Sequence, residues 1–331
     1  MFLPLIFVAI TLISIIIIIL NQRENSKNPP GPPGLPFIGN LHQFDKAKPH
    51  IYLYHLSQKY GPIAYLKHGS TPIIVISSTK MAKELLKTHD LSFCSRPPVV
   101  GQQKLAYNGI DMAFSPYNHH SKEMKKICVL HLLSPKQVLS FRPIREDEVS
   151  RMISKISKTS SSLSDHDQTA NLSDIGMSFA SNLICRVAFG RRYDDDEYEK
   201  IRFDRLIMEA QALMVSFYVS DHFPGLGWID KISGLLGRLS KNCMELDVFY
   251  QQLIDEHLNP SRPKPDREDI IDLMIQLIKD PNSSSLDLTW DHIKALLMSI
   301  IDLMRAQSII DPMITPQKGS EDGKCMTLLI P

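Results

Sequence analysis

The chain has 331 residues, of which 43% are hydrophobic and 22% charged, so it can bury the core of one large or two ordinary globular domains. Its 37 basic and 36 acidic residues leave a net charge of +1, which excludes the strongly positive field that nucleic-acid binding requires. The five cysteines lie far apart and form no Cys-x-x-Cys pair, so the sequence indicates neither a zinc site nor dithiol chemistry.

Residues 1–20 form an almost unbroken apolar run. At ~1.5 Å per helical residue, such a run matches the ~30 Å hydrocarbon layer of a membrane. A cleavable signal peptide is the alternative, but no basic residue precedes the run and no small-x-small cleavage site follows it. Arg23 and Lys27 argue against a buried core helix and place the following chain on the cytoplasmic side. We therefore predict a single-pass anchor with the body facing the cytosol.

A polar, proline-rich hinge follows at residues 21–48. Four of the five residues from 29 to 33 are prolines, which block helix formation and favour a stiff extended backbone. We interpret the hinge as a spacer between the anchor and the body. A generic linker or an SH3-type ligand is the alternative, and no basic residue lies close enough to favour the ligand.

The body, residues 49–298, is predicted to be mainly α with a small β-sheet. The pattern indicates a helix at 49–60 and two β-rich runs, 63–66 and 73–76, which Gly69-Ser70 joins as a hairpin. Ser78 is suited to cap a helix that reaches about residue 88. Amphipathic periodicity predicts further helices at 117–132, 143–160, 171–189, 195–218, 234–258, 268–279 and 288–310.

Five short motifs follow the apolar run and the proline hinge in a fixed order. They are FCSRP at 93–97, DMAFSPY at 111–117, KICVL at 126–130, RVAFG at 186–190 and LTWDHIKALLM at 288–298. Together they closely resemble the plant microsomal (A-type) cytochrome P-450, over about residues 1–298.

The resemblance implies a haem b monooxygenase on the endoplasmic reticulum membrane. Such an enzyme oxidises small lipophilic substrates, here secondary metabolites, with O2 and with electrons from an NADPH-cytochrome reductase. In the family a cysteine thiolate binds the haem iron and favours O–O cleavage.

The sequence departs from the family in the two motifs that carry this chemistry. The ligand loop Phe-x-x-Gly-x-Arg-x-Cys-x-Gly frames none of the five cysteines, so the metal ligand is absent. The oxygen-activating helix of the family carries Ala/Gly-Gly-x-Asp/Glu-Thr, but residues 299–307 contain neither glycine nor threonine. We therefore expect a fold truncated within the long central helix, a divergent tail at 299–331, and no catalytic residue in this chain.

Two interpretations of such a chain remain. It is either an incomplete product of a monooxygenase gene, or a genuine short form that is tethered to the membrane and binds a reductase or a full-length relative without catalysis. Under either interpretation the central helix would lack packing partners, so apolar side chains on it, including Leu296, Leu297, Ile300 and Ile301, are expected to be partly exposed.

The resemblance also assigns cofactor contacts. On the helix near residue 117, Ser121 and Lys125 stand where the family has a tryptophan and an arginine that bind a haem propionate, and Arg96 is a further candidate. Lysine attracts a propionate as a point charge but lacks the planar fork of arginine. A solvated helix face explains Lys122, Lys125 and Lys126 equally well.

By resemblance, residues 99–113 and 210–217 line the substrate pocket. Their apolar side chains suit a lipophilic ligand, although core packing predicts the same composition. The pocket candidates are Val99, Val100, Ala113, Leu213 and Phe217.

Two other patterns are interpreted as surface features. The pairs Glu148…Arg151 and Glu199…Arg202 have the spacing of ion pairs on exposed helix faces, worth ~0.2–0.5 kcal/mol each. His119 and His120 are adjacent, so they point to different sides of a helix and do not suggest a metal site.

Overall fold

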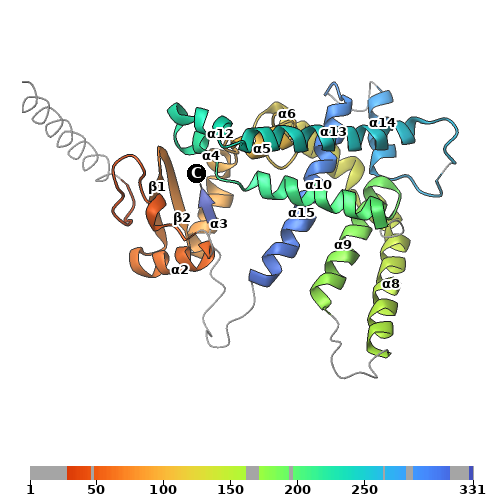
Figure 1. Ribbon diagram of the computed structural model, residues 1–331, viewed down its shortest axis with the longest axis horizontal. Coiled ribbons are helices and arrows are strands. Elements are labelled where there is room, and N and C mark those ends of the chain that lie inside the picture. Colours follow the sequence, from red (N-terminus) through yellow and green to blue (C-terminus); the bar gives the residue numbers. More distant parts are fainter. Residues whose placement is uncertain are drawn as a thin grey trace, which may run out of the picture. The chain divides into compact units, whose positions relative to one another are not determined.

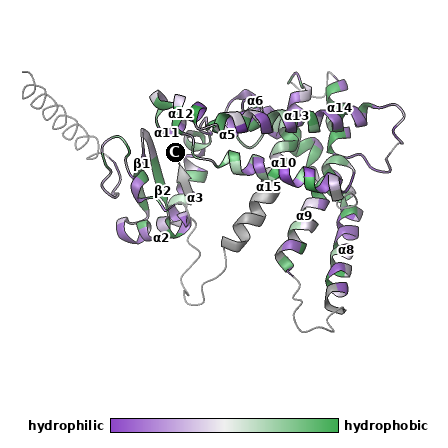
Figure 2. Cartoon of the chain, viewed as in Figure 1, coloured by the Kyte–Doolittle hydropathy of each residue, from purple (hydrophilic) through white to green (hydrophobic). Residues whose placement is uncertain are grey.

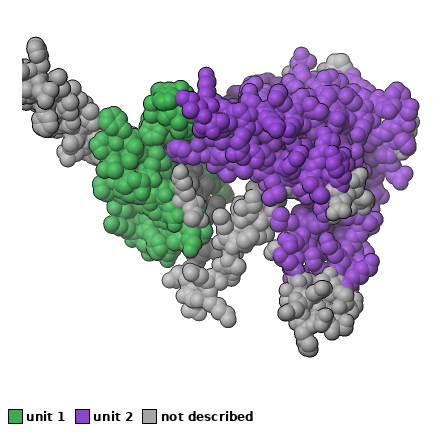
Figure 3. Space-filling model, in the orientation of Figure 1, with its two compact units in different colours: residues 1–95, 218–230, 318–331 green, residues 96–217, 231–317 purple. Residues whose placement is uncertain are grey.

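A computed structural model of the chain describes residues 28–45, 48–161, 171–193, 197–263, 265–280, 286–313 and 328–330 (Figure 1). The predicted anchor at 1–20 lies outside these residues, and so do residues 314–327 and 331 of the predicted tail. Among the helices that the structure describes, none combines the length and the apolar character needed to cross a membrane. The chain divides into two compact units (Figure 3). Unit 1 comprises residues 1–95, 218–230 and 318–331, and unit 2 comprises residues 96–217 and 231–317.

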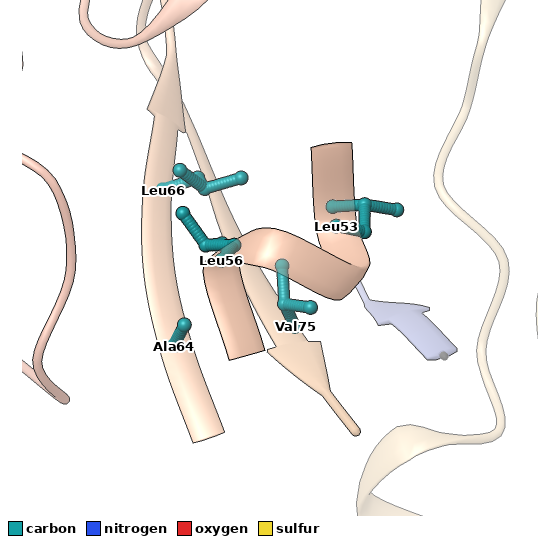
Figure 4. Packing of buried hydrophobic residues seen from close by; sticks show 5 residues of the cluster. All are labelled: Leu53, Leu56, Ala64, Leu66 and Val75. Carbon is teal, nitrogen blue, oxygen red and sulfur yellow. The ribbon is translucent and has the colours of Figure 1, made fainter. Parts of the chain in front are cut away.

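Unit 1 is built on a β-hairpin that one helix covers. Strands β1 (Ile63–His68) and β2 (Thr71–Ile76) pair antiparallel, with Leu66 opposite Ile73, and helix α2 (Pro49–Tyr60) packs on them. The core between helix and hairpin consists of Leu53, Leu56, Ala64, Leu66 and Val75 (Figure 4). Burial alternates along β1, as expected for a strand with one buried face. A third strand, β3 (Leu328–Ile330), pairs antiparallel with β2.

The rest of unit 1 is short helical segments. Helix α3 (Thr79–Lys83) begins as predicted, because the Ser78 Oγ accepts the Met81 N–H at 3.2 Å, and it continues as the π-helical turn η2 (Glu84–Thr88). Short 3-10 and α-helical turns complete the unit: η1 (Leu41–Gln43), α4 (Asp90–Phe93), α11 (Val219–His222) and η4 (Pro224–Leu226).

Unit 2 contains the long amphipathic helices, whose hydrophobic and hydrophilic residues are seen in Figure 2. Its helical segments are α5 (Val100–Leu105), α6 (His119–Ile127), η3 (Cys128–Leu132), α7 (Pro135–Ser140), α8 (Arg142–Ser161), α9 (Leu172–Phe189), α10 (Glu197–Met214), α13 (Leu235–Leu258), α14 (Ile270–Lys279) and α15 (Trp290–Met313). Helix α12 (Trp228–Ile232) begins at the end of unit 1 and finishes in unit 2. The predicted long helices are confirmed to within a few residues. Apart from α3, which the Ser78 cap predicted, the helices of four to six residues were not predicted, because they are too short to show periodicity.

The core of unit 2 lies among the long helices. Helix α15 packs against α9 and α13, helix α8 against α9, and helix α5 against α10 and α13. An aromatic cluster contributes to this core: the Tyr193 and Phe203 rings stack with centroids 4.8 Å apart, and Phe189 and Phe249 meet them at wider angles. Such pairs contribute ~0.5–1.5 kcal/mol each beyond the apolar area that they bury.

The packing of α15 corrects one expectation. Leu296, Leu297 and Ile301 are buried rather than partly exposed, because α9 and α13 cover the helix on this side. Ile300 is half-buried, as expected. The helix also continues without interruption past residue 298 to Met313, so the divergence of the sequence does not break it.

Candidate functional site

The predicted pocket residues gather around α5 and the loop that follows it. Val99 and Val100, at the start of α5, are half-buried, and so is Ala113. Leu213 lies on α10, against which α5 packs, and it is fully buried. A side chain without accessible surface belongs to the core and offers nothing to a ligand in this structure. Phe217, beyond the end of α10, is exposed.

The loop at residues 106–114, here called the α5 loop, begins with an unusual turn. Tyr107, Asn108 and Gly109 all have positive φ, at 51°, 63° and 75°. This left-handed conformation costs a residue other than glycine roughly 1 kcal/mol or more, so the surroundings must hold the loop in place.

Hydrogen bonds hold the start of the α5 loop. The Tyr107 hydroxyl donates to Oδ1 of Asp247 on α13 at 3.0 Å, and Nζ of Lys294 on α15 donates to the same oxygen at 2.7 Å. The Lys294 side chain is only 7% exposed. Burial, more than the neighbouring Asp247 charge, raises the pKa of Tyr107 far above its usual value, so its hydroxyl remains a donor.

A second anchor holds the end of the loop. Asp111 is 1% exposed, and its carboxylate accepts the N–H groups of Ala113 (3.0 Å) and Phe114 (3.1 Å). The hydroxyl of Ser299 on α15 donates to the same carboxylate at 2.7 Å. Burial raises the pKa of Asp111, and these hydrogen bonds, that of Ser299 first, oppose the rise. His120 makes a further contact, Nε2 to the Ile110 carbonyl at 3.0 Å.

The residues assigned to a haem propionate are placed as follows. The Ser121 Oγ accepts the Asn118 N–H at 3.0 Å while the Asn118 side chain accepts the Ser121 N–H at 2.9 Å, so Ser121 forms a capping box at the start of α6. Lys125, one turn further along α6, is exposed. The Arg96 Nε donates to the carbonyl of Ala113 at 3.2 Å, which connects it to the α5 loop.

The structure corrects the interpretation of Glu148. This residue is 2% exposed and pairs with Arg186 Nη1 at 2.8 Å and Arg192 Nε at 3.2 Å, not with Arg151. Arg151 pairs instead with Asp147, at 3.0 Å. The pair at Glu199 and Arg202 does form as predicted, at 3.6 Å.

The adjacent histidines also differ from the expectation. His119 is exposed, but His120 is half-buried, and its ring centroid lies 5.2 Å from that of His292 on α15. Contacts with residues far along the chain, such as this one, leave no sign in local sequence.

Sequence reasoning missed a buried charged cluster between α13 and α14. The His257 Nε2 lies 2.9 Å from the Asp269 carboxylate, and Arg262 reaches Asp269 at 3.2 Å and Asp272 at 2.7 Å. The ligand atoms of His257, Asp269 and Asp272 lie within 4.8 Å of one another, which is the spacing of a metal site. Because the Arg262 guanidinium already binds both carboxylates, we interpret the cluster as a salt-bridge network.

Comparison with known proteins identifies the family. The family model of cytochrome P450 matches residues 29–302. The chain belongs to the cytochrome P450 family. The match extends to residue 302, beyond the predicted boundary at 298, and confirms the resemblance that the ordered motifs indicated.

Similar cytochromes P450 come from plants. The chain is 48% identical over 270 residues to 6,7,8-trihydroxycoumarin synthase of Pastinaca sativa, covering 81% of this chain and 52% of that protein. It is 46% identical over 270 residues to 5-OH-xanthotoxin synthase of Ammi majus, with the same coverage, and 39% identical over 269 residues to strychnine-11-hydroxylase of Strychnos nux-vomica, covering 81% and 51%. The chain thus spans about half the length of the curated relatives it matches.

A solved structure supports the cytochrome P450 fold. A zebra fish cytochrome P450 with progesterone matches with a TM-score of 0.60 at 20% identity, covering 78% of this chain and 57% of that one. At this identity the likeness shows the fold alone. It confirms the predicted mainly α architecture with a small sheet.

The cytochrome P450 family implies a haem, so the described cysteines can be tested as iron ligands. Burial raises the pKa of both Cys128 and Cys243 to about 11, so neither thiol is predisposed to ionise near pH 7. Cys185 is buried in the core, and the half-buried Cys94 has its sulfur 3.5 Å from the Leu91 carbonyl. None of these four cysteines lies in the family's ligand pattern, and Cys325 lies outside the described residues.

Proposed function

We propose that this chain forms the substrate-facing part of a haem monooxygenase that oxidises a planar, coumarin-like secondary metabolite. The observation that carries the proposal is the 48% identity, over 81% of the chain, to a protein named for trihydroxycoumarin synthesis. Two further relatives are named for xanthotoxin-type compounds, which share the flat, lipophilic ring system. Electrons would come from a flavoprotein reductase, as is general in the family.

The half-buried apolar side chains beside the α5 loop support this substrate class. Val99, Val100 and Ala113 present aliphatic surface, which suits a lipophilic ring system. The Arg96 and Asp111 side chains bind the backbone of Ala113 beside this surface. The shallow cavity of about 570 Å³ between α10 and α13 does not suit such a ligand, because arginine and glutamate side chains, among them Arg191, Arg202 and Glu256, line it.

Binding of xanthotoxin to the full 331-residue chain tests the proposal. We expect the fluorescence of the ligand to change saturably, and Val100→Asp to weaken the affinity at least tenfold, because a carboxylate beside the ligand must be desolvated. An acidic residue is tolerated at the first position of a helix, so α5 should persist. The matched control is Val149→Asp on the exposed face of α8, which should leave the affinity unchanged. Equal binding by all three proteins, or none by the wild type, would contradict the proposal.

We further propose that the 331 residues alone do not catalyse the oxidation. The support comes from the sequence: no described cysteine lies in the family's ligand pattern.

A further inference from the structure

We propose that Lys294 and Ser299 on α15 are positioning residues that clamp the α5 loop at two points and thereby set the substrate-facing wall. The inference rests on the proposed function for the identity of the substrate. Each residue acts through a carboxylate: Lys294 through Asp247, which also binds Tyr107, and Ser299 through Asp111.

Two points of attachment restrain the loop more than one would, because a loop that is held at a single point can still rotate about it. Lys294 and Ser299 lie five residues apart on one helix, so their backbones are separated by ~7.5 Å along its axis. Through their partners they hold the loop at two separate positions, near its start at Tyr107 and in its second half at Asp111. Both helix residues are buried, and at Ser299 the partner Asp111 is buried too, so water cannot replace that hydrogen bond without opening the packing.

The backbone of the loop gives independent support. Two residues other than glycine, Tyr107 and Asn108, adopt the left-handed conformation in succession. Such conformations persist only where the surroundings over-determine them, and they cluster at functional sites. Ala113 lies two residues beyond Asp111. Its N–H donates to the Asp111 carboxylate, and its carbonyl accepts from Arg96. A shift of Asp111 would therefore move a pocket candidate directly.

The different exposure of Asp247 and Asp111 predicts that substitutions of Lys294 and Ser299 loosen the loop to different degrees. The Asp247 side chain is partly exposed, so water can replace Lys294 to some extent. Asp111 is buried, so loss of the Ser299 hydroxyl leaves its charge with backbone donors only. Removing Ser299 should therefore loosen the loop more than removing Lys294.

Amide hydrogen exchange and xanthotoxin titration of the full chain test the clamp together. In Ser299→Ala we expect exchange at residues 107–114 to rise at least tenfold, and in Lys294→Met severalfold, with no change in α2 or the β1–β2 hairpin. Xanthotoxin affinity should fall in the same order. The matched controls are Ser240→Ala and Lys241→Met, exposed positions on α13, which should change neither measurement.

Rescue separates positioning from general stability. Ser299→Thr keeps the hydroxyl, so exchange in the loop should stay slow, as in the wild type. Asp111→Asn keeps the shape of the side chain but removes its charge, and it tests the contact between Asp111 and Ser299 from the loop side. Exchange that rises equally throughout unit 2, or a loosened loop with unchanged affinity, would overturn the inference. If the wild type binds no xanthotoxin, the proposed function fails, and the pattern of exchange alone then decides whether the clamp exists.

Discussion

At the scale of single residues, burial decides how much an ion pair contributes to the stability of the fold. Glu148 and Glu146 lie on the same helix, two residues apart, and each pairs with an arginine. Glu146 is exposed, so its pair with Arg142 should contribute well under 1 kcal/mol. Glu148 is buried and pairs with both Arg186 and Arg192, so removing its charge would weaken two ion pairs at once, although Arg186 would keep its pair with Asp147.

We therefore predict that Glu148→Gln lowers the free energy of unfolding by about 3 kcal/mol, as expected for breaking a buried ion pair. Glu146→Gln should change it by less than about 0.5 kcal/mol. Urea denaturation of both variants beside the wild type measures the difference. Similar small effects at the two positions would show that Glu148 is not a structural anchor.

At the scale of elements, a titratable contact joins the end of α13 to the start of α14. The His257 Nδ1 lies 2.6 Å from the Leu253 carbonyl, and its Nε2 lies 2.9 Å from the Asp269 carboxylate, so both nitrogens face acceptors, which favours the doubly protonated ring. Burial alone would lower the pKa of His257, but the hydrogen bond and the charge of Asp269 outweigh it and raise the pKa above its usual value. Asp269 also caps α14, so the contact links the two helices.

The sign of the pH dependence follows from this raised pKa. A histidine with a higher pKa in the folded than in the unfolded state contributes its stability fully below the unfolded pKa of about 6.5 and loses it as the pH rises through the folded value. We predict that raising the pH from 6 to 9 lowers the free energy of unfolding by about 1 kcal/mol through this residue, the usual worth of a charged hydrogen bond. His257→Gln should reduce the dependence of the free energy of unfolding on pH in this range, whereas His119→Gln, at an exposed site, should not. An unchanged profile in His257→Gln would contradict the assignment.

At the scale of the whole molecule, the chain has the family's fold, and no cysteine in its described part lies in the family's ligand pattern. It spans about half the length of the curated relatives, and the cysteines in the part of the chain that the structure describes include two whose pKa burial raises. We therefore expect this chain to bind substrate without thiolate coordination of iron.

Iron coordination can be measured directly. We expect the ferrous, haem-loaded protein to show no red-shifted Soret band of the thiolate type on exposure to carbon monoxide. If that band appears, substitution of each cysteine by serine in turn would identify the ligand, and the proposal that the chain alone lacks catalysis would fall. A matched sample of a full-length plant relative, carrying the ligand loop, serves as the positive control.

Sequence alone determined the features that depend on local chemistry. The helix at 49–60, the hairpin on either side of Gly69-Ser70 and the Ser78 cap are read from residues close together in the chain, and the ordered motifs identified the family. Only the tertiary structure decided which side chains meet. Asp111 and Ser299 lie 188 positions apart, and Glu148 and Arg186 lie 38 apart, so no periodicity relates them. Such pairs arise when helices pack, and packing depends on the three-dimensional fit of many side chains at once rather than on the spacing of a few.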